Sequence, residues 1–338
     1  MSLSYILANF CLIAMIFFSH LGANQIGIIT HTDYVGDREV AWRIKIAAEN
    51  LGWTVFIDEN EGRQISTQQL DWVICMLPNN AFLNPHCPNY LMVFHPFNYL
   101  DNHREFFPFY ERYDGYLLTI HDRDSLENSL KLKNKDFHYI PFFPSLYEIP
   151  YDEVELNYLM LMIPVWSNRL NDPKFKRLYR LLSETNVTKF YGVHTHQEII
   201  SNNYMGSLPF DGISIIDALK KNGIAFVFHS DIHNQERIPS SRIFEAAAAS
   251  TVIISDQNPF VKEHFVDSVF YVDTSVSAEN LFKQINEHLI TIYSNPENAL
   301  QMAKRAHQIF IENFTMEKQL LKLEEMHQKI LFLKKNEL

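Results

Sequence analysis

The sequence has 338 residues, of which 47% are hydrophobic and 20% are charged, so it can form two ordinary domains with buried cores. Its net charge of -11 argues against a nucleic-acid partner, because affinity for phosphate backbones needs clustered lysine and arginine. The chain has 10 glycines but neither G-x-G-x-x-G nor G-x-x-x-x-G-K-[ST], which argues against glycine-rich phosphate loops. Its three cysteines include no C-x-x-C pair and predict no disulfide framework.

The N-terminal stretch 4–22 carries no charged residue and is just long enough to cross a bilayer. A secretory signal usually starts with basic residues, but no Lys or Arg precedes Arg38. Three interpretations of residues 1–23 stay open: a membrane anchor, a cleaved signal, or a helix that docks on the protein. The predicted localisation is therefore cytoplasmic or membrane-associated, with possible membrane contact through this stretch.

Residues 24–150 are predicted to form an N-terminal α/β domain. Short apolar runs alternate with amphipathic stretches, which indicates a parallel sheet covered by helices on both faces. The expected strands are 25–30, 54–57, 72–77, 90–94, 116–120 and 138–142, and the expected helices are 40–51 and 122–132.

After an acidic linker with two prolines, the same pattern restarts and predicts a second α/β domain over residues 155–325. The expected strands are 158–165, 189–193, 224–229, 251–255 and 268–272, and the expected helices are 173–183, 214–221, 241–249, 277–294, 296–313 and 316–335. Gly223 is expected to end the helix 214–221. Two doubly wound, Rossmann-like domains would face a cleft, where ligands bind at the carboxyl ends of the strands.

The stretch 239–256 is the most informative of the sequence. Ser240 or Ser241 can cap a helix whose free amides and dipole form an anion site. Arg242 in the first turn is unfavourable for the dipole unless it binds an anion such as a diphosphate. Glu245, one turn on, could accept hydrogen bonds from two ribose hydroxyls. The alternative is a surface ion pair between Arg242 and Glu245.

This stretch resembles the donor-binding signature of group 1 glycosyltransferases, in the branch of spore-maturation-type enzymes. The residues in step with that signature are Arg242, Phe244, Glu245, Ala246, Ala248 and Asp256. Two positions depart from it: Ser250 replaces a glycine, and Glu236 precedes Glu245 by nine positions where a related pattern has eight. The resemblance covers about residues 155–325, with residues 326–338 as the end of the last helix. It implies a GT-B fold with C-terminal closing helices and a nucleotide-diphosphate sugar as donor.

Further residues are assigned to the two sides of the expected cleft. Arg169, Gly206 and His229 are expected on the donor side, together with Ser240, Ser241, Arg242 and Glu245. Loops after the strands of the first domain would hold the acceptor, with candidates His31, Asp33, Asp37, His95 and His121. The catalytic candidates among all of these are His95, Asp33 and Glu236, since an acid or base acting on the acceptor is usually Asp, Glu or His.

The predicted function is transfer of a sugar from a nucleotide diphosphate to a glycan, lipid or protein acceptor, with retention at the anomeric carbon. No metal site and no cofactor are expected, because no D-x-D motif is convincingly placed and two arginines and a helix dipole can offset the diphosphate charge. Two other classes remain open: a nucleotide-sugar epimerase of the same fold and a non-catalytic nucleotide-sugar-binding protein.

Overall fold

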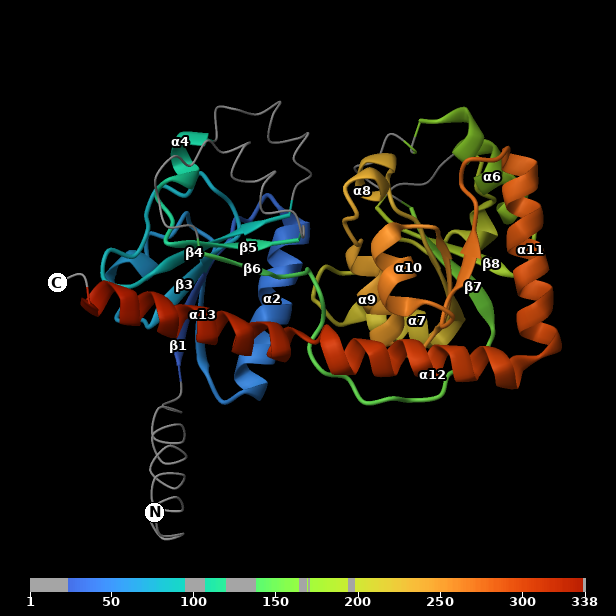
Figure 1. Cartoon of the computed structure of the whole chain (residues 1–338). Coiled ribbons are helices and arrows are strands. Elements are labelled where there is room, and N and C mark those ends of the chain that lie inside the picture. The colour runs from blue at the N-terminus through green and yellow to red at the C-terminus, as the bar shows by residue number, and fades with distance from the viewer. Residues whose placement is uncertain are drawn as a thin grey trace, which may run out of the picture.

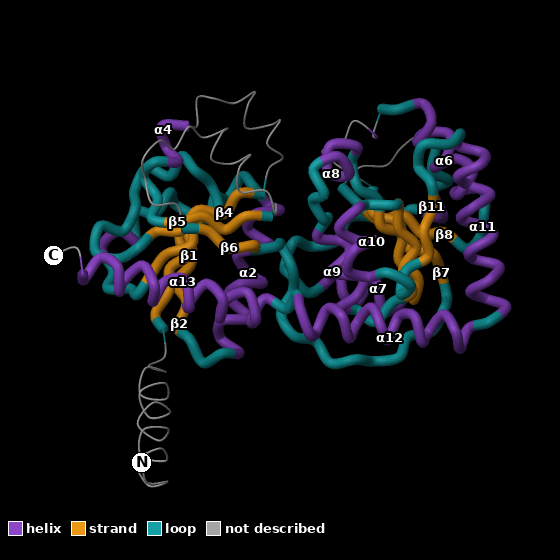
Figure 2. The backbone as a smooth tube through the Cα atoms, in the orientation of Figure 1, coloured by secondary structure: helices purple, strands orange, loops and turns teal. Residues whose placement is uncertain are grey.

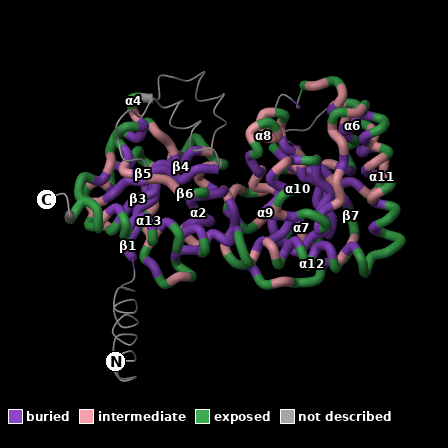
Figure 3. The backbone as a smooth tube through the Cα atoms, in the orientation of Figure 1, coloured by how far each residue is buried: buried purple, intermediate pink, exposed green. Residues whose placement is uncertain are grey.

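The computed structural model describes residues 24–94, 107–119, 138–163, 169, 171–193 and 198–336. These residues form two α/β domains that lie side by side (Figure 1). The strands occupy the centre of each domain and the helices surround them (Figure 2). Burial follows the same arrangement, with buried strands and helices that expose their outer faces (Figure 3).

The N-terminal domain has a six-stranded sheet in the order β2-β1-β3-β4-β5-β6, and every pair in it is parallel. This confirms the parallel sheet predicted from the apolar runs. The strands are β1 (Gln25–Ile29), β2 (Thr54–Asp58), β3 (Trp72–Cys75), β4 (Asn89–Val93), β5 (Gly115–Leu118) and β6 (Tyr139–Pro141). The helices and the 3-10 turn are α2 (Val35–Asn50), α4 (Phe107–Tyr110) and η1 (Ile65–Thr67).

Helix α2 begins five residues before the predicted start at Val40, so the expected boundary was wrong. The first turn contains Gly36 and Asp37 and has no side-chain cap, so neither a cap nor an apolar period marks the start in the sequence. The helix ends as predicted before Gly52, which takes a left-handed conformation with a φ of 79°.

The C-terminal domain has a five-stranded parallel sheet in the order β11-β10-β9-β7-β8. Its strands are β7 (Tyr158–Met162), β8 (Thr188–Tyr191), β9 (Gly223–Val227), β10 (Val252–Asp256) and β11 (Phe270–Val272). Its helices and 3-10 turn are α6 (Pro173–Ser183), η4 (Ser201–Asn203), α7 (Ser214–Asn222), α8 (Asp231–Gln235), α9 (Ser241–Ala248), α10 (Pro259–Phe265), α11 (Ala278–Ser294) and α12 (Pro296–Asn313). Gly223 follows α7 with a φ of 83°, which confirms its predicted role as the residue that ends this helix.

The last helix, α13 (Met316–Asn336), returns to the N-terminal domain. Its buried side chains, including Met316, Leu320 and Leu323, lie in one core cluster with Ala41 of α2 and Trp72 of β3. Figure 1 shows α13 in red, lying across the N-terminal domain beside α2. The predicted second domain, residues 155–325, includes the first half of this helix, yet the helix packs its apolar face into the first domain.

The linker between the domains is tied to the start of α13. The amide of Met316 donates to the carbonyl of Leu146 at 2.7 Å, and the side chain of Gln319 accepts from the amide of Phe143 at 2.5 Å. The chain passes between the domains twice, in the linker and at the α12–α13 junction. These hydrogen bonds connect the two segments.

Two expected segments lie outside the described residues: the stretch 4–22 and the helix 122–132. Within the part of the chain that the structure describes, no helix is both long and apolar enough to cross a membrane.

Candidate functional site

The strand order locates the site expected in the C-terminal domain. Strand β7 has β8 on one side and β9 on the other, so the chain leaves β7 in one direction and returns to its other side. In open α/β sheets this reversal produces a crevice at the carboxyl ends of the strands, where ligands bind. Arg169 follows β7 and His229 follows β9, so both predicted donor-side residues lie at this crevice.

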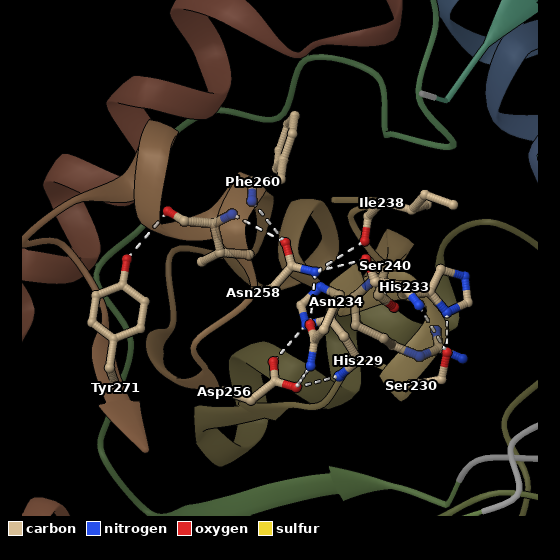
Figure 4. A network of polar contacts seen from close by, with 12 residues as sticks. His229, Ser230, His233, Asn234, Ile238, Ser240, Asp256, Asn258, Phe260 and Tyr271 are labelled. Atoms are coloured by element: carbon tan, nitrogen blue, oxygen red, sulfur yellow. Dashed lines mark hydrogen bonds and ion pairs between the residues drawn. The ribbon is translucent and has the colours of Figure 1, made fainter. Parts of the chain in front are cut away.

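A buried histidine and aspartate form the centre of this site (Figure 4). The Nδ1 atom of His229 lies 2.6 Å from Oδ1 of Asp256, and the backbone amide of His229 donates to Oδ2 of the same carboxylate at 3.1 Å. Asn234 donates a third hydrogen bond to Oδ2 at 3.0 Å. Burial raises the pKa of Asp256, but these hydrogen bonds and the charges of His229 and Arg169 outweigh it, so the pKa lies below its usual value.

Asn258 joins this cluster to the segment that precedes α9. Its amide nitrogen donates to the carbonyl of Ile238 at 3.1 Å and to the side-chain oxygen of Asn234 at 2.9 Å. Its side-chain oxygen caps α10 by accepting from the amides of Phe260 and Val261. The segment 229–241 is thereby held at the carboxyl end of β10 before any ligand is present.

Arg169 is buried beside the same carboxylate, with 2% of its surface exposed. Its guanidinium lies over the rings of Phe175 and Phe228, at 4.6 and 5.2 Å from the ring centroids. Its Nη2 atom is 3.3 Å from Oδ1 of Asp231 and 3.7 Å from Oδ2 of Asp256. The cation is therefore held rigidly by aromatic walls and two carboxylates.

Three nitrogen atoms of this cluster have no hydrogen-bond partner among the described residues. They are Nε and Nη1 of Arg169 and Nε2 of His229, and all three are buried. Buried polar groups are nearly always satisfied, so such a group indicates a place where a ligand or water binds. An anion that accepts from Arg169 would satisfy the two guanidinium nitrogens.

Helix α9 begins as predicted at the segment after Ser240. The hydroxyl of Ser240 accepts from the amide of Arg242 at 3.3 Å, and Ser241 is the first helical residue. The amides of the first turn point toward the carboxyl ends of the strands, because α9 leads from that edge of the sheet back to the start of β10. The alanines that follow are fully buried and let the helix lie close to the sheet.

Glu245 is where the structure departs from expectation. Its side chain was expected to face an open cleft beside Arg242, but only 1% of it is exposed. Oε2 accepts from Nη1 of Arg242 at 2.6 Å, and Oε1 accepts from Nη2 of Arg43 at 2.8 Å. Arg43 belongs to α2 of the N-terminal domain, so this ion pair joins the two domains across 202 positions of sequence.

A fourth charge completes this interdomain network. Glu39, one turn before Arg43 on α2, lies 3.0 Å from the same Nη2 atom. Gly212 lies against Arg43 from the other domain, where an added Cβ would be 3.2 Å from the arginine Cγ. The alternative of a surface ion pair between Arg242 and Glu245 is correct about the partner but wrong about the location, because Glu245 is buried at the interface while Arg242 stays 31% exposed.

Electrostatics show how the three buried charges share this network. Burial raises the pKa of Glu245, but Arg242 and Arg43 outweigh it and lower the pKa to about 2. Burial lowers the pKa of Arg43, yet Glu245 and Glu39 hold it above its usual value. The pKa of Glu39 is raised, mainly by burial and also by the neighbouring Glu245 charge. Glu245 is thus the carboxylate that carries the interdomain pair.

The remaining donor-side candidate, Gly206, has a φ of 93° and open space where a Cβ would stand. Glycine adopts this left-handed backbone conformation without strain. Because it has no side chain, a ligand can approach the backbone closely there.

The acceptor-side and catalytic candidates are only partly placed. His95 and His121 lie outside the described residues. Asp33 is exposed after β1, with its amide donating to Nδ1 of His31 at 3.3 Å. Glu236 follows α8 and is half-buried. Asp37 lies in the first turn of α2, and burial raises its pKa to about 6.

The sequence did not single out three residues that the structure places in these networks: Asp256 as the partner of His229, and Glu39 and Arg43 on α2. Asp256 had a signal, because β9 and β10 are consecutive strands and pair in parallel, which brings their carboxyl ends together. Arg43 had none, since its partner is in another domain. Within the described part of the chain, no group of three or more His, Cys, Asp or Glu residues could hold a metal ion.

Comparisons with known proteins agree with this architecture. Residues 178–325 match a family model described as "Glycosyl transferase-like". No curated protein matches the sequence. Among solved structures, sucrose-phosphate synthase from Thermosynechococcus elongatus aligns with a TM-score of 0.58 at 10% identity, over 92% of this chain and 100% of that one.

Alr3699/HepE from Anabaena, solved with UDP and glucose, aligns with a TM-score of 0.57 at 11% identity, over 89% of this chain and 99% of that one. TarM aligns with a TM-score of 0.51 at 11% identity over 76% of this chain, which spans about half of that protein (54%). At these identities the likeness establishes the fold.

The two doubly wound domains and their closing helices are therefore the GT-B fold of glycosyltransferases. Within this fold, residues 178–325 are the part that matches the glycosyl transferase-like family model, and this part contains Arg242, Glu245 and the His229–Asp256 pair. The resemblance to the spore-maturation branch stays a prediction.

Proposed function

We propose that the protein transfers a sugar from a nucleotide-diphosphate donor to an acceptor bound by the N-terminal domain. The observation that carries the proposal is the cluster at the carboxyl ends of β7, β9 and β10, where Arg169 and His229 have buried nitrogen atoms with no partner in the described part of the chain. A diphosphate supplies the acceptor oxygens that the two Arg169 nitrogens lack, and the first turn of α9 adds backbone amides beside them.

Asp231 has a defined part in this proposal. It pairs with Arg169, but its side chain is 69% exposed, so a phosphate can displace it from the arginine at little cost. Asp256 stays in place, because its oxygens are already bound by His229 and Asn234. Arg169 would then exchange an exposed carboxylate for the donor phosphate while keeping its aromatic walls.

Arg242 and Glu245 differ in how readily each can contact the nucleotide-sugar donor. Arg242 is 31% exposed at the start of α9 and can turn toward a phosphate there. For Glu245 to hold the ribose hydroxyls, Arg43 or Arg242 would first have to release one of its oxygens. We propose the ribose contact on the family resemblance and expect it to accompany a rearrangement at the domain interface.

Charge on the leaving nucleotide diphosphate would be offset by Arg169, Arg242 and the first turn of α9, so we propose a metal-independent enzyme. Retention at the anomeric carbon remains the proposed stereochemistry, on the resemblance to the related signature.

A panel of nucleotide sugars tests the proposal directly. A donor that binds the native state should raise the melting temperature, and about 100 Kd of ligand corresponds to about 2.7 kcal/mol of added stability. The effective donor should then release free nucleotide when acceptors are supplied, and a chelator should leave both results unchanged. An epimerase would instead return an isomerised nucleotide sugar, and a binding protein would return the donor intact.

Variants locate the donor within the site. Arg169→Gln and Arg242→Ala should each weaken nucleotide diphosphates by about 1.5–3 kcal/mol, since each removes a hydrogen bond to a charged group. Arg169→Gln should leave the affinity for a nucleoside that lacks phosphate unchanged, whereas Arg242→Ala also frees one oxygen of Glu245 and can change that affinity. Equal affinities for the diphosphate in the parent and both variants would remove the donor site from this position.

A further inference from the structure

A cavity of about 670 Å³ opens in the N-terminal domain, at the carboxyl ends of β1 and β2. It is lined by Thr32, Trp42, Ile57, Glu59, Asn60 and Gln64. Helix α2 forms one wall through Trp42, and the next residue on this helix, Arg43, reaches Glu245 of the other domain. The helix that braces the domain interface therefore also borders this cavity.

The loop after β2, which forms the polar side of the cavity, is held in place by hydrogen bonds to Asp58. The buried carboxylate of Asp58 accepts from the backbone amides of Asn60 at 2.7 Å, Gln64 at 2.6 Å and Ile65 at 3.1 Å. An isolated antiparallel bridge also joins Asn60 to His31 after β1. Asn60 and Gln64 enter these bonds through their backbone amides alone, so their side chains remain available at a fixed position.

The apolar wall consists of Trp42 and the half-buried Ile57. Trp42 lies on the side of α2 opposite the residues that enter the core, Val40, Ala41 and Ile44, and 39% of it is exposed. A large indole that stays exposed over a cavity is suited to packing against a flat, partly apolar ligand.

The polar wall carries groups that donate and accept hydrogen bonds with little charge. Asn60 and Gln64 each offer an amide, Thr32 a hydroxyl and Glu59 a carboxylate. Among the described residues that line the cavity there is no lysine or arginine, which disfavours a phosphorylated or otherwise anionic ligand. A single aromatic wall and two neutral amides also fit a neutral polyhydroxy ligand better than a cation, which would call for several aromatic or acidic groups.

We propose that this cavity is a saccharide-binding subsite. A sugar ring presents C–H groups on its face and hydroxyls around its edge, so the face packs on Trp42 while the edge bonds to Glu59, Asn60 and Gln64. The inference rests on the proposed function in one respect: it takes the bound saccharide as the acceptor. The acceptor class is then a glycan, rather than a lipid chain or a peptide.

Calorimetric titration of the full chain tests the subsite, and tryptophan fluorescence accompanies it. Of the four tryptophans, Trp42 is exposed, Trp53 and Trp72 are buried, and Trp166 lies outside the described residues. The probes are trisaccharides of glucose, galactose, mannose and N-acetylglucosamine, each titrated separately. At least one should bind. Trp42→Ala should weaken it by about tenfold or more, as expected for loss of an aromatic anchor, and Trp42→Phe should retain most of the affinity.

Two further variants keep the test decisive. Gln64→Ala removes an exposed side chain of the polar wall and should weaken the same saccharide even if Trp42→Ala does not fold. Phe332→Ala removes another exposed aromatic side chain, on α13 and outside the cavity, and should have no effect. Failure of every trisaccharide to bind, or equal binding to the parent, Trp42→Ala and Gln64→Ala proteins, would overturn the subsite.

Titrating nucleotide sugars into the same proteins separates this inference from the proposed function. Trp42→Ala should bind nucleotide sugars as the parent does, since the two sites are in different domains. If nucleotide sugars bind and no saccharide does, the subsite is wrong and the proposed function stands. If saccharide binding depends on Trp42 and no nucleotide sugar binds, the subsite stands and the proposed function fails.

Discussion

Two buried arginines in this protein are held by carboxylates, and they differ in how completely their surroundings are satisfied. Arg43 and Arg169 are exposed by 1% and 2%. In the interdomain network, both oxygens of Glu245 are bound by arginines from different helices, and only Nε of Arg43 has no partner among the described residues. In the network after β7 and β9, three nitrogens of Arg169 and His229 have none.

The difference separates a structural network from a binding site. A buried charge pair whose partners lie in two domains specifies how the domains meet, and removing one partner leaves an uncompensated charge inside the interface. A buried cation that keeps unused donors at the carboxyl ends of the strands can bind a further anion, which a ligand can bring. The same residue types thus predict loss of stability in one place and loss of ligand affinity in the other.

The largest expected effect is on folding. Glu245→Ala should lower the free energy of unfolding by about 3–5 kcal/mol, because it leaves Arg43 buried without its main partner. The matched control is Glu263→Ala, since Glu263 pairs with Arg237 on the surface and should cost under about 1 kcal/mol. Denaturant unfolding of both variants gives the two losses in free energy of unfolding. Equal losses would mean that the buried Glu245 contributes no more than a surface ion pair.

The second effect depends on pH. The pKa of Glu245 is lowered to about 2, so the stabilisation from its carboxylate is fully present above its unfolded pKa and is lost as pH falls toward 2. The raised pKa of Glu39 acts in the opposite direction, so the informative quantity is the difference between the parent and Glu245→Gln. This difference should shrink steadily below about pH 4, and a difference that stays constant down to pH 2 would contradict the assignment.

A smaller effect should appear at the binding site. Asp231→Asn removes the exposed carboxylate that competes with phosphate for Arg169, so inorganic pyrophosphate should bind up to about fivefold more tightly. Stability should change little, because the side chain is mostly in solvent. Calorimetric titration gives the ratio, and weaker binding in the variant would mean that Asp231 supports the ligand instead of competing with it.

The smallest effect concerns Asp37. Burial raises its pKa to about 6. The carboxylate is therefore still mostly ionised at pH 7, but its ionisation costs more free energy in the folded protein than in the unfolded chain. Asp37→Asn should stabilise slightly at pH 7, by under about 1 kcal/mol, because solvent screens the group and the helix dipole partly favours its charge. The gain should vanish below about pH 4, where the carboxyl is protonated in both states. Melting curves at the two pH values check it.

Local patterns in the sequence were sufficient for most of the fold. Apolar runs predicted all eleven strands of the described residues to within a few positions, because the strands of a parallel sheet covered by helices are rich in apolar residues. Ser240 and Gly223 marked a helix start and a helix end through their own backbone chemistry. The start of α2 was missed since no capping residue precedes Val35.

Contacts between distant segments could not be predicted in the same way. The apolar stripe of α13 shows that one face is buried but not that it packs on the first domain. The pairing of Glu245 with Arg242 was predicted, because the two residues are one helical turn apart. Its second partner, Arg43, could not be predicted, because it reaches Glu245 only when the two domains meet. The site at His229 and Asp256 lies between these cases, because strand adjacency alone brings the two residues together.

Calorimetric titration of inorganic pyrophosphate into the parent, Arg169→Gln and Glu245→Gln proteins tests the central distinction most directly. The account predicts that Arg169→Gln weakens pyrophosphate by about tenfold or more while its fold is largely kept, since a charge-assisted bond to the ligand is lost. It predicts that Glu245→Gln unfolds at lower denaturant but binds pyrophosphate as the parent does. Unchanged affinity in Arg169→Gln, or a loss of affinity in Glu245→Gln as large as that in Arg169→Gln, would contradict it.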